Sequence, residues 1–224
     1  MIYLAADIHG HIRLDWLRKE LQAFPLSDED HLIILGDAGI VWSSTEHADV
    51  LEFYEQLPCK TLFLDGNHEN FTLLNKYPII NLYGGKVHRI GEKVFHLMRG
   101  EIYLIAGVRL FVFGGGFSAK KLTNTSPVFV WEEEMPSQEE YENGVANLQH
   151  TAYFVDYVLT HVPPASLAEL MTIPLYAEER NLNEYLQKIS ECSQFQKWYF
   201  GHCHRDISLG KYVGIYNRIV KIGE

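Results

Sequence analysis

The sequence is poor in cysteine and in positive charge, and it lacks long apolar runs. Its three cysteines, Cys59, Cys192 and Cys203, are widely spaced and form no Cys-x-x-Cys pair. This pattern argues for reduced thiols rather than a disulfide framework. No apolar run reaches the ~18 residues of a membrane-spanning helix, and the first residues, "MIYLAADIHG", contain no basic segment of a secretory signal. These absences predict a cytoplasmic protein without a membrane segment.

The shortage of basic residues narrows the possible partners. The 224 residues include 19 Lys and Arg against 29 Asp and Glu, which gives a net charge of −10. Phosphate backbones attract basic surfaces, so this balance argues against sequence-independent binding of nucleic acids. Small phosphorylated substrates are compatible with it, because a local cation reverses the field inside a cleft.

Short apolar runs alternate with amphipathic stretches in the first third of the chain. Two such runs, at residues 2–7 and 31–37, are predicted strands, and the stretch 60–69 contains a third. Helical spacing of apolar residues follows the first run over 14–24, and a second helix is expected over 45–57 with Thr45 as its N-cap. Strands that alternate with helices indicate βαβ units and a parallel sheet. The carboxyl ends of such strands are where open α/β sheets bind ligands.

The rest of the chain is predicted to continue in the same domain. Several β-like runs separated by glycine over residues 79–113 indicate antiparallel hairpins or a meander. Two capped helices are expected later, from Ser137 toward Gln149 and from Asn181 to about Cys192. Predicted strands at 155–161 and 197–202 accompany them. Without repeats, low-complexity tracts or linkers, we expect one domain over residues 1–224.

Five short polar segments each follow a strand-like run. They are "DIHG" (7–10), "GDAG" (36–39), "GNHE" (66–69), "TH" (160–161) and "GHCH" (201–204). Taken singly, each is compatible with a helix cap, a turn or a satisfied polar residue at a strand end. A sheet, however, would bring all five to one edge. Seven oxygen and nitrogen donors would then share one region: Asp7, His9, Asp37, Asn67, His161, His202 and His204.

The chemistry of these donors predicts a metal site. His202 and His204 alternate on a predicted strand, so both should face one side, and Cys203 should point away from them. Oxygen and nitrogen donors without a thiolate favour Mn²⁺, Fe or Zn²⁺. Seven ligands are too many for one ion, whereas two ions that share a carboxylate fit. Two-metal sites with ions ~3.5–4 Å apart are the working parts of phosphatases and nucleases.

The order of the five segments resembles that of the calcineurin-like metallophosphoesterases, whose pattern is DxH, GD, GNH[ED], a lone His and GHxH. The resemblance spans residues 7–204. It implies a four-layer αββα sandwich of the α/β class (α+β in some schemes), with two mixed sheets and a binuclear metal site at the strand ends. It also implies a role for each residue. Asp7, His9, Asp37 and His204 would hold the first ion, with Asp37 bridging, and Asn67, His161 and His202 would complete the second.

The resemblance also implies a reaction. A metal-bridging hydroxide would attack the phosphorus of a phosphomonoester or phosphodiester, with two divalent ions (Mn, Fe or Zn) as cofactors. His68 would lie outside the metal ligands as the general acid or as a phosphate-holding group. The expected partner is a phosphorylated small molecule or a nucleotide-like substrate. Segments such as "GDAGIVW" and "FVFGGGFSAKK" resemble a small bacterial or prophage-type branch of the superfamily.

One motif departs from the Ser/Thr protein phosphatases of the superfamily, which carry GDxxDRG. Ile40 and Val41 replace the second Asp and the Arg, which disfavours the alternative of a protein phosphatase. His68 then needs another orienting group, either Asp65 or a backbone carbonyl. Three other arginines are candidates to bind the phosphate in place of the missing Arg: Arg99, Arg109 and Arg205.

A non-catalytic scaffold on the same fold is a further alternative. Such a protein should have lost metal ligands, whereas every expected ligand position is filled here.

Three aromatic residues leave two interpretations open: Trp42, Phe117 and Trp131. They either cover a base or aryl group of the substrate, near the segment 114–135, or are ordinary core and loop aromatics.

Overall fold

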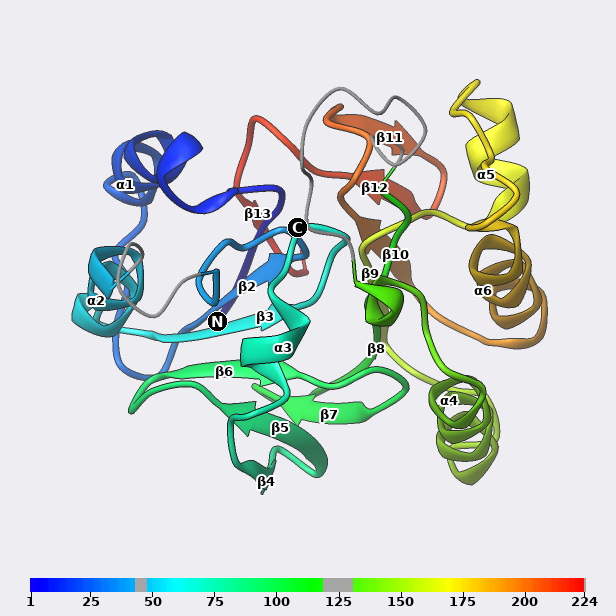
Figure 1. Ribbon diagram of the computed structural model, residues 1–224, viewed down its shortest axis with the longest axis horizontal. Coiled ribbons are helices and arrows are strands. Elements are labelled where there is room, and N and C mark those ends of the chain that lie inside the picture. Colours follow the sequence, from blue (N-terminus) through cyan, green and yellow to red (C-terminus); the bar gives the residue numbers. More distant parts are fainter. Residues whose placement is uncertain (43–47, 119–130, 224) are drawn as a thin grey trace.

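Two β-sheets face each other in the computed structural model, which describes residues 1–42, 48–118 and 131–223 (Figure 1). The expected N-cap Thr45 lies outside the described residues. The first sheet has the order β13 (Val220–Lys221), β1 (Ile2–Ala5), β2 (His31–Leu35), β3 (Lys60–Leu64), β6 (Val94–Leu97), β5 (Gly85–Arg89) and β4 (Ile79–Leu82). β1, β2, β3 and β6 run parallel, while β13, β5 and β4 add antiparallel pairs.

The second sheet is also mixed. Its order is β11 (Ile207–Leu209), β12 (Tyr212–Gly214), β10 (Lys197–Phe200), β9 (Tyr157–Thr160), β8 (Val108–Phe113) and β7 (Ile102–Ile105). β8, β9, β10 and β12 are parallel neighbours, and the two edge strands pair antiparallel. The predicted meander is therefore divided between the sheets, because β6 joins β3 and β8 joins β9.

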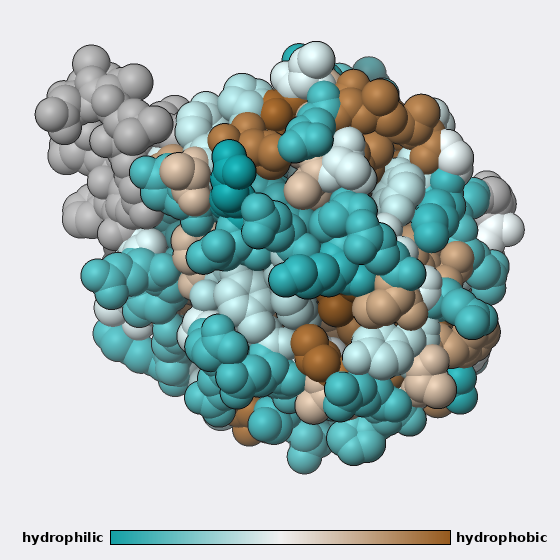
Figure 2. Space-filling view, turned by 90° about the vertical axis from the view of Figure 1, so that its right-hand side faces the viewer, coloured by the Kyte–Doolittle hydropathy of each residue, from teal (hydrophilic) through white to brown (hydrophobic). Residues whose placement is uncertain are grey.

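Helices cover the outer face of each sheet, which confirms the predicted four layers (Figure 1). The first sheet carries α1 (Leu14–Leu21), α2 (Ala48–Gln56) and α3 (Phe71–Leu74), and the second carries α4 (Gln138–His150), α5 (Ala165–Leu170) and α6 (Arg180–Cys192). The outer face over α4, α5 and α6 is mostly hydrophilic, with apolar side chains gathered near its upper edge (Figure 2). In the described residues, no helix is long and apolar enough to cross a membrane.

Three apolar clusters hold the layers together. The central cluster lies between the sheets and includes Leu35, Leu64, Leu159 and Tyr199, each with no exposed surface. One cluster lies between each sheet and its helices. Complete burial of one such side chain contributes ~1.5–3 kcal/mol, so the central strands are rigid supports for the loops at their carboxyl ends.

Two capped helices are predicted in the second half of the chain; α4 has its predicted N-cap and α6 does not. In α4, the Ser137 Oγ accepts a hydrogen bond from the Glu140 amide, and the Glu140 carboxylate accepts one from the Ser137 amide, as expected of a capping box. In α6, Asn181 is not the cap, because the helix already begins at Arg180 after Glu179. The carboxylate of Glu179 is instead turned toward the site described next.

Candidate functional site

The seven predicted donors converge where the central strands of both sheets end. Asp7, Asp37 and Asn67 follow β1, β2 and β3, and His161 and the histidines of "GHCH" follow β9 and β10. The face-to-face packing of the sheets brings these loops together. Asp7, Asp37 and His161 offer ligand atoms within 4.8 Å of one another, and so do Asp7, His9 and His204.

The first group of donors consists of Asp7, His9, His204 and the Oδ2 atom of Asp37. The Nε2 atoms of His9 and His204 lie 3.3 Å apart. The Asp37 Oδ2 is 3.6 Å from the His9 Nε2, and the Asp7 Oδ1 is 3.7 Å from the His204 Nε2. Four donor atoms therefore border one small space.

The second group of donors consists of Asn67, His161, His202 and the Oδ1 atom of Asp37. The Asn67 Oδ1 lies 3.1 Å from both the His161 Nε2 and the His202 Nδ1, and these two nitrogens are 3.2 Å apart. The Asp37 Oδ1 is 3.6 Å from the His161 Nε2. One carboxylate thus faces both groups, with one oxygen toward each.

The proton positions show that this second group suits a cation. The His161 Nδ1 lies 2.9 Å from the Leu35 carbonyl oxygen, which can only accept, so the proton sits on Nδ1 and the Nε2 has a lone pair. The Asn67 Nδ2 donates to the Ser118 Oγ, which turns the amide oxygen inward. An oxygen and a nitrogen that both present lone pairs then meet at 3.1 Å. A divalent ion between them removes this conflict, and the oxygen and nitrogen set fits Mn²⁺, Fe or Zn²⁺.

The pKa shifts of the buried groups also favour a bound cation. Burial, together with the charge of Asp37, raises the pKa of Asp7 well above its usual value. Burial lowers the pKa of His9 and of His161 to about 4, so both imidazoles are neutral near pH 7 and their lone pairs are available. Burial opposes the ionisation of Asp37, but the neighbouring histidines hold its pKa below the usual value.

The loops that carry the donors have an unusual backbone. Asp7, His9, Asp37, His202 and His204 all have φ between 49° and 65°, a left-handed conformation that is uncommon outside glycine and that clusters at functional sites. "GHCH" is therefore a loop beyond β10, and the prediction that it lies on a strand is wrong.

Glycines make room for this arrangement. A Cβ on Gly36 would lie 2.1 Å from the His161 Nδ1, and a Cβ on Gly66 would lie 2.1 Å from the Asp37 Oδ1. The glycines in "GD" and "GNHE" are thus required by close approach of the ligands. No side chain fits at either position without displacing a donor.

Three supporting side chains lie outside the five motifs. The Glu179 carboxylate accepts the Phe117 amide at 2.8 Å and lies 3.7 Å from the His202 Nε2, so its charge faces the ring nitrogen of His202 that is not directed at Asn67. Ser118 orients Asn67, as described above. The Tyr216 ring stacks on His204 at 4.7 Å. No local pattern marks these residues, because their roles depend on contacts between distant segments.

His68 lies at the edge of the donor groups. Its amide donates to the Asp37 Oδ1 at 2.8 Å, and its ring lies 5.4 Å from the His9 ring. Asp65 does not orient it, because the Asp65 carboxylate is engaged by Arg99 and His96. This engagement also removes Arg99 as a phosphate clamp, since its guanidinium is buried in that ion pair.

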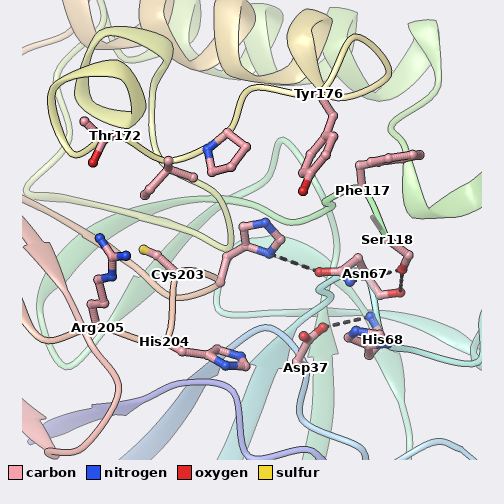
Figure 3. Close-up of a pocket in the computed structure, with 13 residues that line it drawn as sticks. Asp37, Asn67, His68, Phe117, Ser118, Thr172, Tyr176, Cys203, His204 and Arg205 are labelled. Carbon is pink, nitrogen blue, oxygen red and sulfur yellow. Dashed lines mark hydrogen bonds between the residues drawn. The ribbon is translucent and has the colours of Figure 1, made fainter. Parts of the chain in front are cut away.

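A cavity of about 310 Å³ opens beside the donors (Figure 3). Of the three arginine candidates for a clamp, only Arg205 lines it; Arg109 lies at the opposite end of β8. Of the three aromatic candidates, only Phe117 lines it, whereas Trp42 and Trp131 pack on each other at 5.8 Å. The residues at the cavity wall are Asp37, Asn67, His68, Phe117, Ser118, Thr172, Ile173, Pro174, Tyr176, His202, Cys203, His204 and Arg205.

Cys203 borders the cavity but is a poor ligand. Its thiol donates to the Gly201 carbonyl at 3.1 Å, and burial raises its pKa to about 12, so the thiolate is scarce near pH 7. The thiol is therefore not the metal-binding group of the "GHCH" loop.

The comparison with known proteins agrees with this geometry. The sequence model of the calcineurin-like phosphoesterase family matches residues 1–206. The chain therefore belongs to the calcineurin-like phosphoesterase family, whose members are hydrolases, and the family implies divalent metal ions. A comparison with curated proteins gives no significant match.

Two solved structures are similar to this chain. Phosphopantetheinyl hydrolase from Mycobacterium tuberculosis has 16% sequence identity and a TM-score of 0.56, with 96% of this chain and 87% of that chain covered. A Staphylococcus aureus protein described as a 5′-nucleotidase, in complex with alpha-ketoglutarate, has 13% identity and a TM-score of 0.48, with 96% and 48% covered. At 16% identity, the similarity to phosphopantetheinyl hydrolase concerns the fold alone. The similarity to the Staphylococcus aureus protein has a TM-score below 0.5 and carries no argument.

Proposed function

We propose that this protein is a binuclear metal-dependent phosphoesterase that hydrolyses phosphomonoesters or phosphodiesters of small molecules. The observation that carries the proposal is the position of Asp37, whose two carboxylate oxygens face two separate sets of donors. Asp7, His9, Asp37 and His204 would hold one ion, and Asp37, Asn67, His161 and His202 the other. Bound divalent cations would activate a water and stabilise charge on the phosphoryl oxygens.

His68 is proposed to give a proton to the leaving oxygen. It borders the cavity beside Asn67 and Asp37, where the scissile ester would sit. The hydrogen bond from its backbone amide to Asp37 fixes this loop against the ligand set. A departing alkoxide needs a proton, and a positioned imidazole contributes ~10²–10⁴-fold through such a transfer.

A protein phosphatase is the weaker alternative. Ile40 and Val41 occupy the positions of the expected Asp and Arg, and both are buried in the apolar cluster between the first sheet and its helices. Neither presents a polar atom to a phosphate. The cavity, at about 310 Å³, is also at the small end of the range for ligand pockets, which suits a small molecule.

A metal-by-substrate screen tests the proposal. Metal-free protein is loaded with Mn²⁺, Fe²⁺, Zn²⁺ or Mg²⁺, and each form is assayed with an aryl phosphomonoester, an aryl phosphodiester and 2′,3′-cyclic nucleotides. We expect turnover with at least one pair, and its loss in Asp37→Asn. Bound metal without turnover of any ester would instead support a non-catalytic scaffold.

A further inference from the structure

The cavity beside the metal ligands has two unlike walls (Figure 3). Phe117 and Tyr176 form one wall, with ring centroids 5.5 Å apart; Phe117 is 3% exposed, so the half-buried Tyr176 presents most of the wall's surface, and its hydroxyl points into the space. Arg205 stands on the opposite side. Four of the proposed donors line the floor between these walls: Asp37, Asn67, His202 and His204.

The aromatic wall is held in place. Glu179 is buried, accepts the Phe117 amide, and donates its own amide to the Tyr176 carbonyl at 3.1 Å. One residue therefore fixes both halves of the wall and also lies against His202. A flat apolar group that enters the cavity meets a surface whose position is already set, so little ordering is needed on binding.

Arg205 gives the opposite wall its positive charge. Among the residues that the structure describes, it is the only lysine or arginine that lines the cavity, and its side chain has no hydrogen bond or ion pair with any of them. It is exposed at the mouth of the cavity, whereas Asp37 and Asn67 on the floor are buried. An unpaired guanidinium in this position suits an anionic group away from the floor, because it binds phosphate and carboxylate through paired N–H groups.

We propose that the cavity is a leaving-group subsite for nucleotide-like esters, with an aromatic ring against Phe117 and Tyr176 and a second phosphate on Arg205. The proposal rests on the proposed function, in which the scissile phosphate occupies the floor. The preferred class is then a nucleoside bisphosphate or a dinucleotide. Simple aryl phosphates fill the floor and the aromatic wall and leave Arg205 unused.

The test compares Arg205→Ala with wild type in the metal-loaded enzyme, using p-nitrophenyl phosphate, a nucleoside 5′-monophosphate and a nucleoside 3′,5′-bisphosphate. We expect KM for the bisphosphate to rise about tenfold or more, as for one lost charge-assisted hydrogen bond. KM for p-nitrophenyl phosphate should stay within about twofold. The Kd of the bisphosphate, measured by calorimetry on Ca²⁺-loaded protein, should rise by the same factor as KM.

Arg109→Ala is the matched control. It removes the same charge at the far, exposed end of β8 and should leave all constants unchanged. If Arg205→Ala raises KM equally for all three substrates, or for none of them, the subsite is overturned while the phosphoesterase activity stands. If wild type hydrolyses none of the three and also none of the diesters in the metal-by-substrate screen, the proposed function fails instead.

Discussion

Replacing Asp37 by Asn should separate metal binding from folding. Asp37 and Asp7 are both buried, and the carboxylate of each faces histidine nitrogens. Asparagine keeps the shape and can still accept the His68 amide. Burial and the charge of Asp37 raise the pKa of Asp7, so these two buried carboxyl groups oppose each other's ionisation, and the substitution removes that opposition. We therefore expect metal-free Asp37→Asn to be at least as stable as metal-free wild type.

The metal-loaded forms should differ in the opposite direction. Two ions, each at 100 times its Kd, stabilise the folded state by ~5.4 kcal/mol, or ~2.7 kcal/mol per site. Each kcal/mol shifts Tm by ~2–4 °C in a chain of this size, which predicts a rise of ~11–22 °C for wild type. Asp37→Asn should show less than half of that rise, because the substituted residue faces both donor groups.

Thermal unfolding in EDTA and in excess Mn²⁺ measures both effects. Asp15→Asn is the control, since Asp15 is exposed and pairs only with Arg18 three residues on. Its Tm should follow wild type in both conditions. If Asp37→Asn loses stability without metal and keeps the full Mn²⁺ shift, Asp37 is a structural residue and the bridging role is refuted.

Three further outcomes are expected. His68→Ala should keep its bound metal, measured by elemental analysis, while kcat falls by ~10²–10⁴-fold; unchanged turnover would remove His68 from the reaction. Glu179→Gln keeps an acceptor for the Phe117 amide but loses the charge beside His202, so metal affinity should fall by ~10–100-fold with little change in metal-free Tm. His31 is buried outside the site and burial lowers its pKa to about 4. Below the unfolded pKa of ~6.5 the unfolded state takes up this proton first, so His31 alone should lower stability toward pH 4 by at most ~1.4 kcal/mol per unit; His31→Gln should lessen the measured slope by up to that amount in urea titrations, and an unchanged slope would contradict the assignment.

The parts of the site that were predictable are those set by local chemistry. Asp7, Asp37 and Asn67 follow buried apolar runs, and the parallel arrangement of those strands is enough to place them together. The Ser137 capping box was also predictable, because it depends on residues three positions apart.

Other features depend on contacts that a local pattern does not contain. The loop geometry of His202 and His204 comes from positive φ angles, which alternation along a strand cannot indicate. Glu179 lies after a loop in the second half of the chain and reaches His202 only in the folded protein. The hairpin-like runs likewise do not reveal that β6 belongs to one sheet and β8 to the other.

The binuclear site is tested by the metal stoichiometry and spin coupling of the Mn²⁺-loaded protein. Elemental analysis combined with electron paramagnetic resonance reports how many ions are bound and whether a shared ligand couples them. Since Asp37 presents one oxygen to each donor group, we predict two ions per chain with an exchange-coupled spectrum. A single ion per chain with an isolated six-line spectrum would contradict the binuclear site.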